Sequence, residues 1–260
     1  MTTPAAPPPL IDYGRLLDMI GIEGELMINS AIPALPHAAR AVVPGCPDLT
    51  LEGTMTHVGG VHRATRLWVR DGRRPERWQR SPSDGDVVDF VRTGLRELLA
   101  ELRRHDPAEP CDTWWPAHRK HGFWWRRMAH ETTVHRVDVQ AAAGGPVHAV
   151  DPEVALDGID ELLFLWFGYR LGELRLSSPR RGTVALSAAD RRWLAVFEPG
   201  RSIARRVDDA EARLADATVS GDPAELYLWG WGRLPDQSVR ISGDLDAAAS
   251  LWALLRPATQ

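Results

Sequence analysis

The sequence predicts an α+β protein of two domains, a four-helix bundle over residues 10–146 and a small α/β domain over residues 151–258. In the first part, long segments carry apolar residues at the spacing of an amphipathic helix. The second part alternates short β-like runs with helices. Between the two parts lies Gly144-Gly145-Pro146, which is typical of a turn that ends a helix. With 260 residues, 44% of them hydrophobic, the chain is long enough to bury two cores.

Four helical segments make up the predicted bundle. Thr50 is a suitable N-cap for the second segment, and Pro33 and Pro36 are expected to end the first. The segments are expected at residues 10–32, 50–69, 86–105 and 118–143. Before them, the Pro-Ala-Ala-Pro-Pro-Pro run that starts at Pro4 predicts a disordered tail over residues 1–9.

The α/β domain is predicted from a second set of signals. Asp151-Pro152 and Asp222-Pro223 each place an N-cap residue before a proline at the first helical position. They predict two helices, of which the first extends to about Leu171. The β-like runs are residues 183–186, 193–198, 202–207, 213–219 and 238–241, and a last helix is expected at 245–255.

Composition and charge exclude several classes of protein. The chain has 35 acidic and 31 basic residues, which give a net charge of −4. Its basic residues form no contiguous block, so nucleic acid is not an expected partner. No apolar run approaches the length of a membrane span, and no export signal begins the chain. Cys46 and Cys111 form no CxxC motif, so neither a disulfide framework nor a cysteine zinc site is expected. We therefore expect a soluble cytoplasmic protein without a membrane partner.

The segment around Glu131 contains the residue types that are most suited to metal binding or catalysis. It differs from the HExxH motif of zinc proteases, which would need a second histidine where Val134 stands. His130 and His135 are five residues apart, about 140° around a helix, and so do not face one metal ion together. Glu131 and His135 are four apart on one helical face and can reach the same ion.

A third ligand must come from another helix. His57 and His62 are also five apart, so at most one of them can point at a shared site. One histidine from one helix and a Glu/His pair from another would leave an open position for a water or substrate atom, as in catalytic zinc sites. The alternative is an ordinary ion pair between Glu131 and Arg127, which lies four residues earlier.

Four tryptophans also allow two interpretations. They either line a pocket or belong to the core and its rim. They are Trp114, Trp115, Trp124 and Trp125.

Three stretches together resemble the mycothiol-dependent maleylpyruvate isomerase family. Val43–Thr50, running into Thr56–Arg63, looks like the first metal helix of that family. Arg127–Asp138 looks like its second metal segment, and Leu228–Arg233, followed by Val239–Asp244, is similar to its C-terminal module. The resemblance covers residues 10–256 in the order that the family has.

This resemblance implies a DinB-like bundle that holds a divalent ion, with zinc expected, on His57, Glu131 and His135. It implies mycothiol as the thiol cosubstrate, together with a small-molecule substrate. It further implies an arginine near the site. Arg233 matches the Trp-Gly-Arg motif and is expected to act in catalysis, and Arg77 or Arg80 is a second candidate.

The expected activity is that of a mycothiol-dependent metalloenzyme. Coordination to a divalent ion deprotonates a thiol, and the thiolate can then attack an electrophilic carbon. The reaction is either thiol S-transfer or cis-trans isomerisation of the maleylpyruvate type. S-transfer is favoured slightly because the four tryptophans predict an aromatic pocket. The alternative is a non-catalytic small-molecule binding protein that keeps the DinB-like fold.

Overall fold

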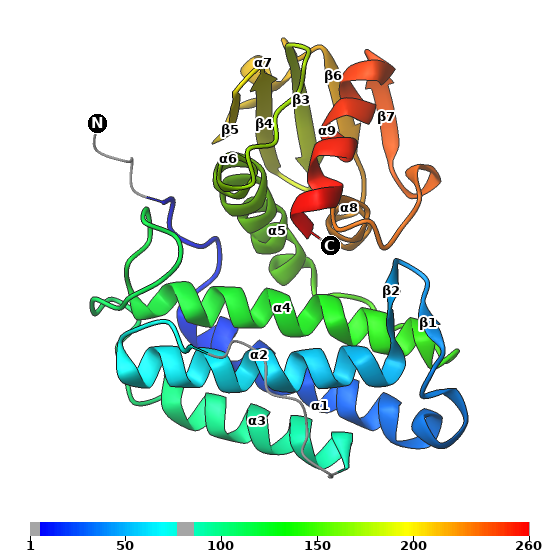
Figure 1. The fold of residues 1–260 in the computed structure, drawn as a ribbon. Helices are drawn as coiled ribbons and strands as arrows, with labels where there is room; N and C mark the ends of the chain where they lie inside the picture. The colour runs from blue at the N-terminus through cyan, green and yellow to red at the C-terminus, as the bar shows by residue number, and fades with distance from the viewer. Residues whose placement is uncertain (1–5, 77–85, 260) are drawn as a thin grey trace. The chain divides into compact units, whose positions relative to one another are not determined.

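The computed structural model describes residues 6–76 and 86–259. The chain forms two compact units, Met1–Ala149 and Val150–Gln260, which we call the helical unit and the sheet unit. Their contents confirm the predicted fold class, since the first is a helix bundle and the second contains a sheet (Figure 1). Arg77 and Arg80 lie outside the described residues, as do the first five residues of the expected tail.

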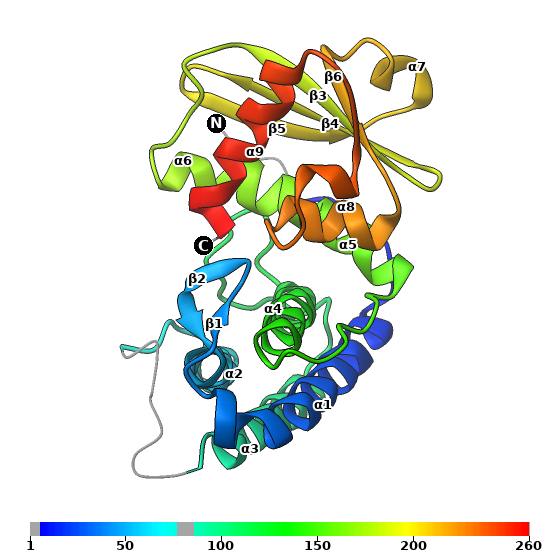
Figure 2. The same cartoon turned by 90° about the vertical axis from the view of Figure 1, so that its right-hand side faces the viewer.

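Four long helices build the helical unit. They form a closed ring of contacts, in which α1 packs on α4, α4 on α2, α2 on α3, and α3 on α1. Figure 2 views this arrangement nearly along α2 and α4. The helices are α1 (Tyr13–Ala38), α2 (Leu51–Asp71), α3 (Val87–Leu102) and α4 (His121–Ala142).

Local capping fixes the limits of α2. The Thr50 hydroxyl oxygen accepts the amide hydrogen of Gly53 at 3.1 Å, as an N-cap should. Gly72 follows the helix with φ 64°, a left-handed conformation that suits glycine. In the middle of α2, Gly59 allows α3 to approach closely, because a Cβ atom there would lie 2.5 Å from the Phe90 ring. Glycine at this position therefore allows the two helices to pack closely.

Two features of the first fifty residues differ from expectation. Helix α1 continues through Pro33 and Pro36 to Ala38; a proline removes an amide donor, but its fixed φ remains compatible with a helix. Strands β1 (Val42–Val43) and β2 (Cys46–Thr50) then form an antiparallel hairpin that the sequence analysis missed. The proline-glycine pair between the two strands was the signal for its turn.

The N-terminal segment also differs from a free tail. The backbone amide of Ala6 donates to the carbonyl oxygen of Ala117 at 2.9 Å. The expected tail is therefore attached to the helical unit at this residue.

A five-stranded sheet organises the sheet unit. Its strand order is β5-β4-β3-β6-β7, with β3 and β6 parallel and the other neighbours antiparallel. The strands therefore pair with one another and are separate from the helix bundle. They are β3 (Gly182–Ala188), β4 (Arg191–Glu198), β5 (Arg201–Arg206), β6 (Ala217–Ser220) and β7 (Arg240–Gly243).

The two faces of this sheet pack against different helices. On one face, Ala185 and Leu194, which are direct partners, pack against Ala212 of the short helix α7 (Asp209–Ala212). Side chains alternate along a strand, so their neighbours face the opposite side. There the sheet contacts α9 (Leu245–Thr259) and the π-helical segment η1 (Leu162–Arg170).

The helices of the sheet unit refine the expected boundaries. The single helix expected up to Leu171 consists of α5 (Pro152–Glu161), η1 and α6 (Leu171–Glu173). The strand expected at residues 213–219 is limited to β6, because residues 213–216 form a turn and a bend. Helix α8 (Pro223–Gly230) has Asp222 as its N-cap and Pro223 as its first residue, as predicted. None of the helices within the described ranges is long and apolar enough to cross a bilayer.

His118 makes the stability of the helical unit dependent on pH. Its side chain lies against the rings of Trp115 and Phe123 and is 9% exposed. Burial, and then the charges of Arg126 and Lys120, lower the pKa of His118 from 6.5 to about 4. Between these values the unfolded chain binds a proton that the folded chain excludes, so the folded state loses stability as pH falls.

We expect the free energy of unfolding to fall by up to about 1.4 kcal/mol per pH unit between pH 6.5 and about 4 because of this histidine. Urea unfolding at several pH values, followed by circular dichroism, measures the slope. His118→Gln should make this slope less steep, whereas the matched substitution at the exposed His37 should not. An unchanged slope in His118→Gln would contradict the assignment.

Candidate metal centre

Helix α4 is buried along almost its whole length. Glu131 and Ala141 are half-buried, and every other residue of the helix is buried. Buried polar groups need partners, and α4 supplies several within the bundle. The Arg136 guanidinium, for example, donates to Glu23 on α1 at 2.5 Å and to the Gln140 side chain at 3.0 Å. The polar face of α4 is thus part of the bundle interior.

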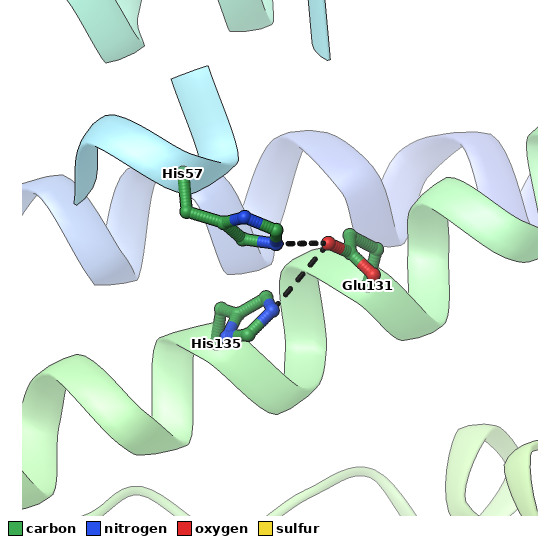
Figure 3. Close-up of side chains that lie close together, drawn as sticks. All are labelled: His57, Glu131 and His135. Carbon is green, nitrogen blue, oxygen red and sulfur yellow. Dashed lines mark hydrogen bonds and ion pairs between the residues drawn. The ribbon is translucent and has the colours of Figure 1, made fainter. Parts of the chain in front are cut away.

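Glu131 lies between two histidines on this face. Its Oε1 atom is 3.1 Å from Nε2 of His57 on α2 and 3.4 Å from Nε2 of His135 on α4 (Figure 3). The two imidazole rings are 4.9 Å apart, at 72° to each other. The structure therefore brings together the three residues that the resemblance assigned as metal ligands.

The remaining histidines of the two segments lie elsewhere. Nε2 of His62 is 3.1 Å from the hydroxyl of Thr132, and its side chain is completely buried. His130, also completely buried, is not a member of the Glu131 cluster. The expectation that only one histidine of each five-residue pair faces the site agrees with this geometry.

The cluster has strong internal electrostatics. Burial acts to raise the pKa of Glu131, but His135, His57 and Arg127 outweigh it and lower that pKa well below 4.5. Burial likewise disfavours a charged His135, yet the charge of Glu131 and hydrogen bonds with Asp138 and Glu131 raise its pKa to about 9. Without an ion, Glu131 is therefore a carboxylate and His135 a cation at neutral pH.

Two further residues of α4 orient these groups. Nδ1 of His135 lies 2.9 Å from Oδ2 of Asp138, which directs its Nε2 atom toward Glu131. The Arg127 guanidinium donates to Oε2 of Glu131 at 3.2 Å and leaves Oε1 facing the histidines. The ion pair considered as an alternative is therefore present together with the cluster. Sequence analysis did not assign Asp138, although its position three residues after His135 on the same helical face was a signal.

The cluster fits a divalent metal ion by its donor set. One donor atom from each of His57, Glu131 and His135 lies within 4.8 Å of the other two. Two imidazole nitrogens and a carboxylate oxygen suit zinc and similar ions. A carboxylate on the second nitrogen of a ligating histidine, as Asp138 provides, is a common support in such sites. The side chains of His57 and Glu131 are 28% and 15% exposed, so the cluster is in contact with solvent.

Arg233, the predicted catalytic arginine, lies in the sheet unit just after α8. Its Nη1 atom donates to the carbonyl oxygen of Trp231 at 2.7 Å, and the residue is half-buried. This contact at a helix end is the one expected of an arginine that stabilises the fold. The structure thus gives Arg233 a structural contact, and its catalytic role stays a prediction.

Three of the four tryptophans considered for a pocket are core residues, whereas Trp114 is half-buried and lies edge-on to Phe123 with ring centres 5.3 Å apart. Trp115, Trp124 and Trp125 are all less than 10% exposed. Trp124 packs on Trp68 with ring centres 4.9 Å apart, and its indole donates to the carbonyl oxygen of Asp112 at 3.0 Å. The proposed aromatic pocket therefore has no support from these three residues, because packing in the core occupies their faces.

Comparisons with known proteins agree with this architecture. Residues 31–140 match the family model of the Mycothiol maleylpyruvate isomerase N-terminal domain, and residues 153–250 match that of the MDMPI C-terminal domain. The first match includes His57, Glu131 and His135. No curated protein matches the sequence.

Solved structures with the same fold include two crystal structures of mycothiol-dependent maleylpyruvate isomerase. One, a histidine-to-alanine mutant, has a TM-score of 0.61, 12% identity, and coverage of 91% of this chain and 96% of its own. The other has a TM-score of 0.59 at the same identity and coverage. At this identity the likeness establishes the fold, and the two domain models establish the relationship. The chain belongs to the mycothiol-dependent maleylpyruvate isomerase family.

Proposed function

We propose that this protein is a mycothiol-dependent metalloenzyme that uses the thiol of mycothiol as a nucleophile toward an electrophilic small molecule. The supporting observation is the contact of one oxygen, Oε1 of Glu131, with Nε2 of both His57 and His135. These residues lie within the part of the chain that matches the family's N-terminal domain. Zinc is the ion we propose, because the donors are two imidazoles and a carboxylate.

Each residue of the cluster has a separate task in this proposal. His57, Glu131 and His135 would hold the ion, which supplies positive charge that favours the thiolate form of a bound thiol. Asp138 accepts a hydrogen bond from the N–H at Nδ1 of His135 and thereby keeps Nε2 available for the ion. Arg127 neutralises Glu131 from its other oxygen and fixes the carboxylate. Four side chains of α4 therefore serve this one site, two as ligands and two as their supports.

Two reaction classes are consistent with this site. In an isomerase, a sulfur–carbon bond forms at an activated double bond, rotation follows, and the same bond breaks. In an S-transferase, the sulfur–carbon bond persists in the product. The preference for S-transfer depended on an aromatic pocket, and the packing of Trp115, Trp124 and Trp125 removes that support. Assays with mycothiol and either maleylpyruvate or an alkylating electrophile distinguish the two classes.

Elemental analysis combined with calorimetric titration of mycothiol is the most direct test. We expect about one ion at this centre, as in other sites with three protein ligands, and mycothiol binding that depends on it. A purified protein that takes up no divalent ion and does not bind mycothiol would instead support the non-catalytic binding protein.

Replacement of the proposed ligands should remove the ion at this centre. We expect His57→Ala, Glu131→Gln and His135→Ala each to lose this ion and the thiol-dependent turnover, because two remaining ligands hold a divalent ion weakly. His62→Asn is the control, since His62 lies on α2 but contacts Thr132. Metal content and turnover measured on folded protein decide the point, and retention of both in all three variants would refute the assignment.

The role of Asp138 gives a graded prediction. Asp138→Asn keeps the size of the side chain but removes its charge, so the affinity for Zn²⁺ at this centre should fall by about 10–100-fold. Competitive titration against a chelator measures the change. Asp18→Asn, an exposed substitution on α1, controls for net charge. Equal affinities in Asp138→Asn and wild type would show that Asp138 serves packing alone.

For Arg233, catalytic and structural roles predict different losses. An arginine that pairs with developing negative charge should cost about 2.7–4 kcal/mol of transition-state stabilisation when replaced by alanine. A cation that only stabilises the end of α8 contributes about 0.3–1 kcal/mol to stability. We expect Arg233→Ala to show the larger loss in kcat/KM. Full turnover with a slightly lower melting temperature would assign the structural role instead.

A further inference from the structure

A second histidine and glutamate cluster lies where α3 connects to α4 in the helical unit. His105 follows α3, Glu109 belongs to the connection, and His121 is the first residue of α4. One donor atom from each of the three lies within 4.8 Å of the other two. No residue of this cluster belongs to the Glu131 centre.

Backbone hydrogen bonds build this cluster. The amide of His121 donates to the carbonyl oxygen of Glu109 at 3.1 Å, and the amide of Gly122 donates to that of Pro107 at 2.9 Å. The amide of His105 donates to the carbonyl oxygen of Leu102 at 3.1 Å. The main chain therefore fixes the positions from which all three side chains project.

The two imidazoles lie face to face. The rings of His105 and His121 are 4.1 Å apart and within 10° of parallel. His121 is 7% exposed, and its Nδ1 atom is buried without a hydrogen-bond partner in the described parts of the chain. A buried nitrogen of this kind costs free energy unless a ligand occupies it.

A buried carboxylate supports His105. Oε1 of Glu101 lies 3.2 Å from Nε2 of His105, and the Glu101 side chain is 6% exposed. The pairing matches that of Asp138 with His135 in the first centre, where a carboxylate contacts one imidazole nitrogen and leaves the other free. Both clusters thus combine two histidines, one glutamate and a supporting carboxylate.

We propose that His105, Glu109 and His121 form a second divalent-metal site, which closes the connection between α3 and α4. Two nitrogen donors and one oxygen select zinc, cobalt or nickel over magnesium and calcium, which prefer oxygen ligands. Bonds of 2.0–2.1 Å to a tetrahedral ion place the donors about 3.3 Å apart. The lone pairs of imidazole nitrogens lie in the ring planes, so one of the two stacked rings has to turn before both nitrogens face one ion. His105, whose side chain is 25% exposed, is the less buried of the two and would turn, while the exposed Glu109 side chain moves inward.

Metal stoichiometry tests the proposal on the full-length protein. After treatment with a chelator, the protein is loaded with Zn²⁺ or Co²⁺, and bound metal is measured per chain. We expect two ions in wild type, one in Glu131→Gln, and one in either His105→Gln or Glu109→Gln. Glu25→Gln, an exposed substitution on α1, is the matched control and should retain both ions.

Thermal unfolding provides the second measurement, because Glu109→Gln changes an exposed side chain and should still fold. Metal should raise the melting temperature of Glu131→Gln, and this increase should disappear when His105→Gln is added. The second site would be overturned if wild type bound a single ion, Glu131→Gln bound none, and His105→Gln still bound one. A single ion lost only in His105→Gln or Glu109→Gln would support it while contradicting the metal site of the proposed function.

Discussion

The packing of α2 against α4 depends on the placement of one negative charge, that of the half-buried Glu131. Glu131 faces the bundle interior, where an isolated carboxylate would be costly. It is held there by His57, His135 and Arg127, three contacts between 3.1 and 3.4 Å. Because His57 belongs to α2 and the other groups to α4, the same contacts fix the relative position of these two helices.

The other polar groups of α4 extend this arrangement. Arg136 pairs with Glu23 on α1, and His62 of α2 contacts Thr132. Helix α4 is therefore bound to both of its neighbours by polar contacts within the interior. Polar groups at these positions specify one register of packing, whereas an apolar surface would accept several. This requirement accounts for the dense sequence of charged and histidine residues between Arg126 and Gln140.

Sequence analysis predicted the features that depend on local patterns. The caps at Thr50 and Asp222 marked helix starts, and the i,i+4 spacing placed Glu131 and His135 on one face. The choice of His57 over His62 needed the family resemblance, because helical spacing alone treats the two equally. An apolar pattern does not encode side-chain hydrogen bonds, turns or tertiary packing. For this reason three features were missed: the Asp138 contact, the hairpin of β1 and β2, and the interruption of the expected helix by η1. The continuation of α1 through Pro33 and Pro36 has the same origin.

The division of the first centre between two helices has a consequence for how it assembles. Arg127, Glu131, His135 and Asp138 take their relative positions as soon as α4 forms a helix, since each is three or four residues from the next. His57 joins them only when α2 docks, through a contact that spans 74 residues of sequence. Such long-range contacts are costly to close and form late. Affinity for an ion at this centre would therefore report on the docking of α2, and substitutions far from the ligands could alter it by shifting one helix.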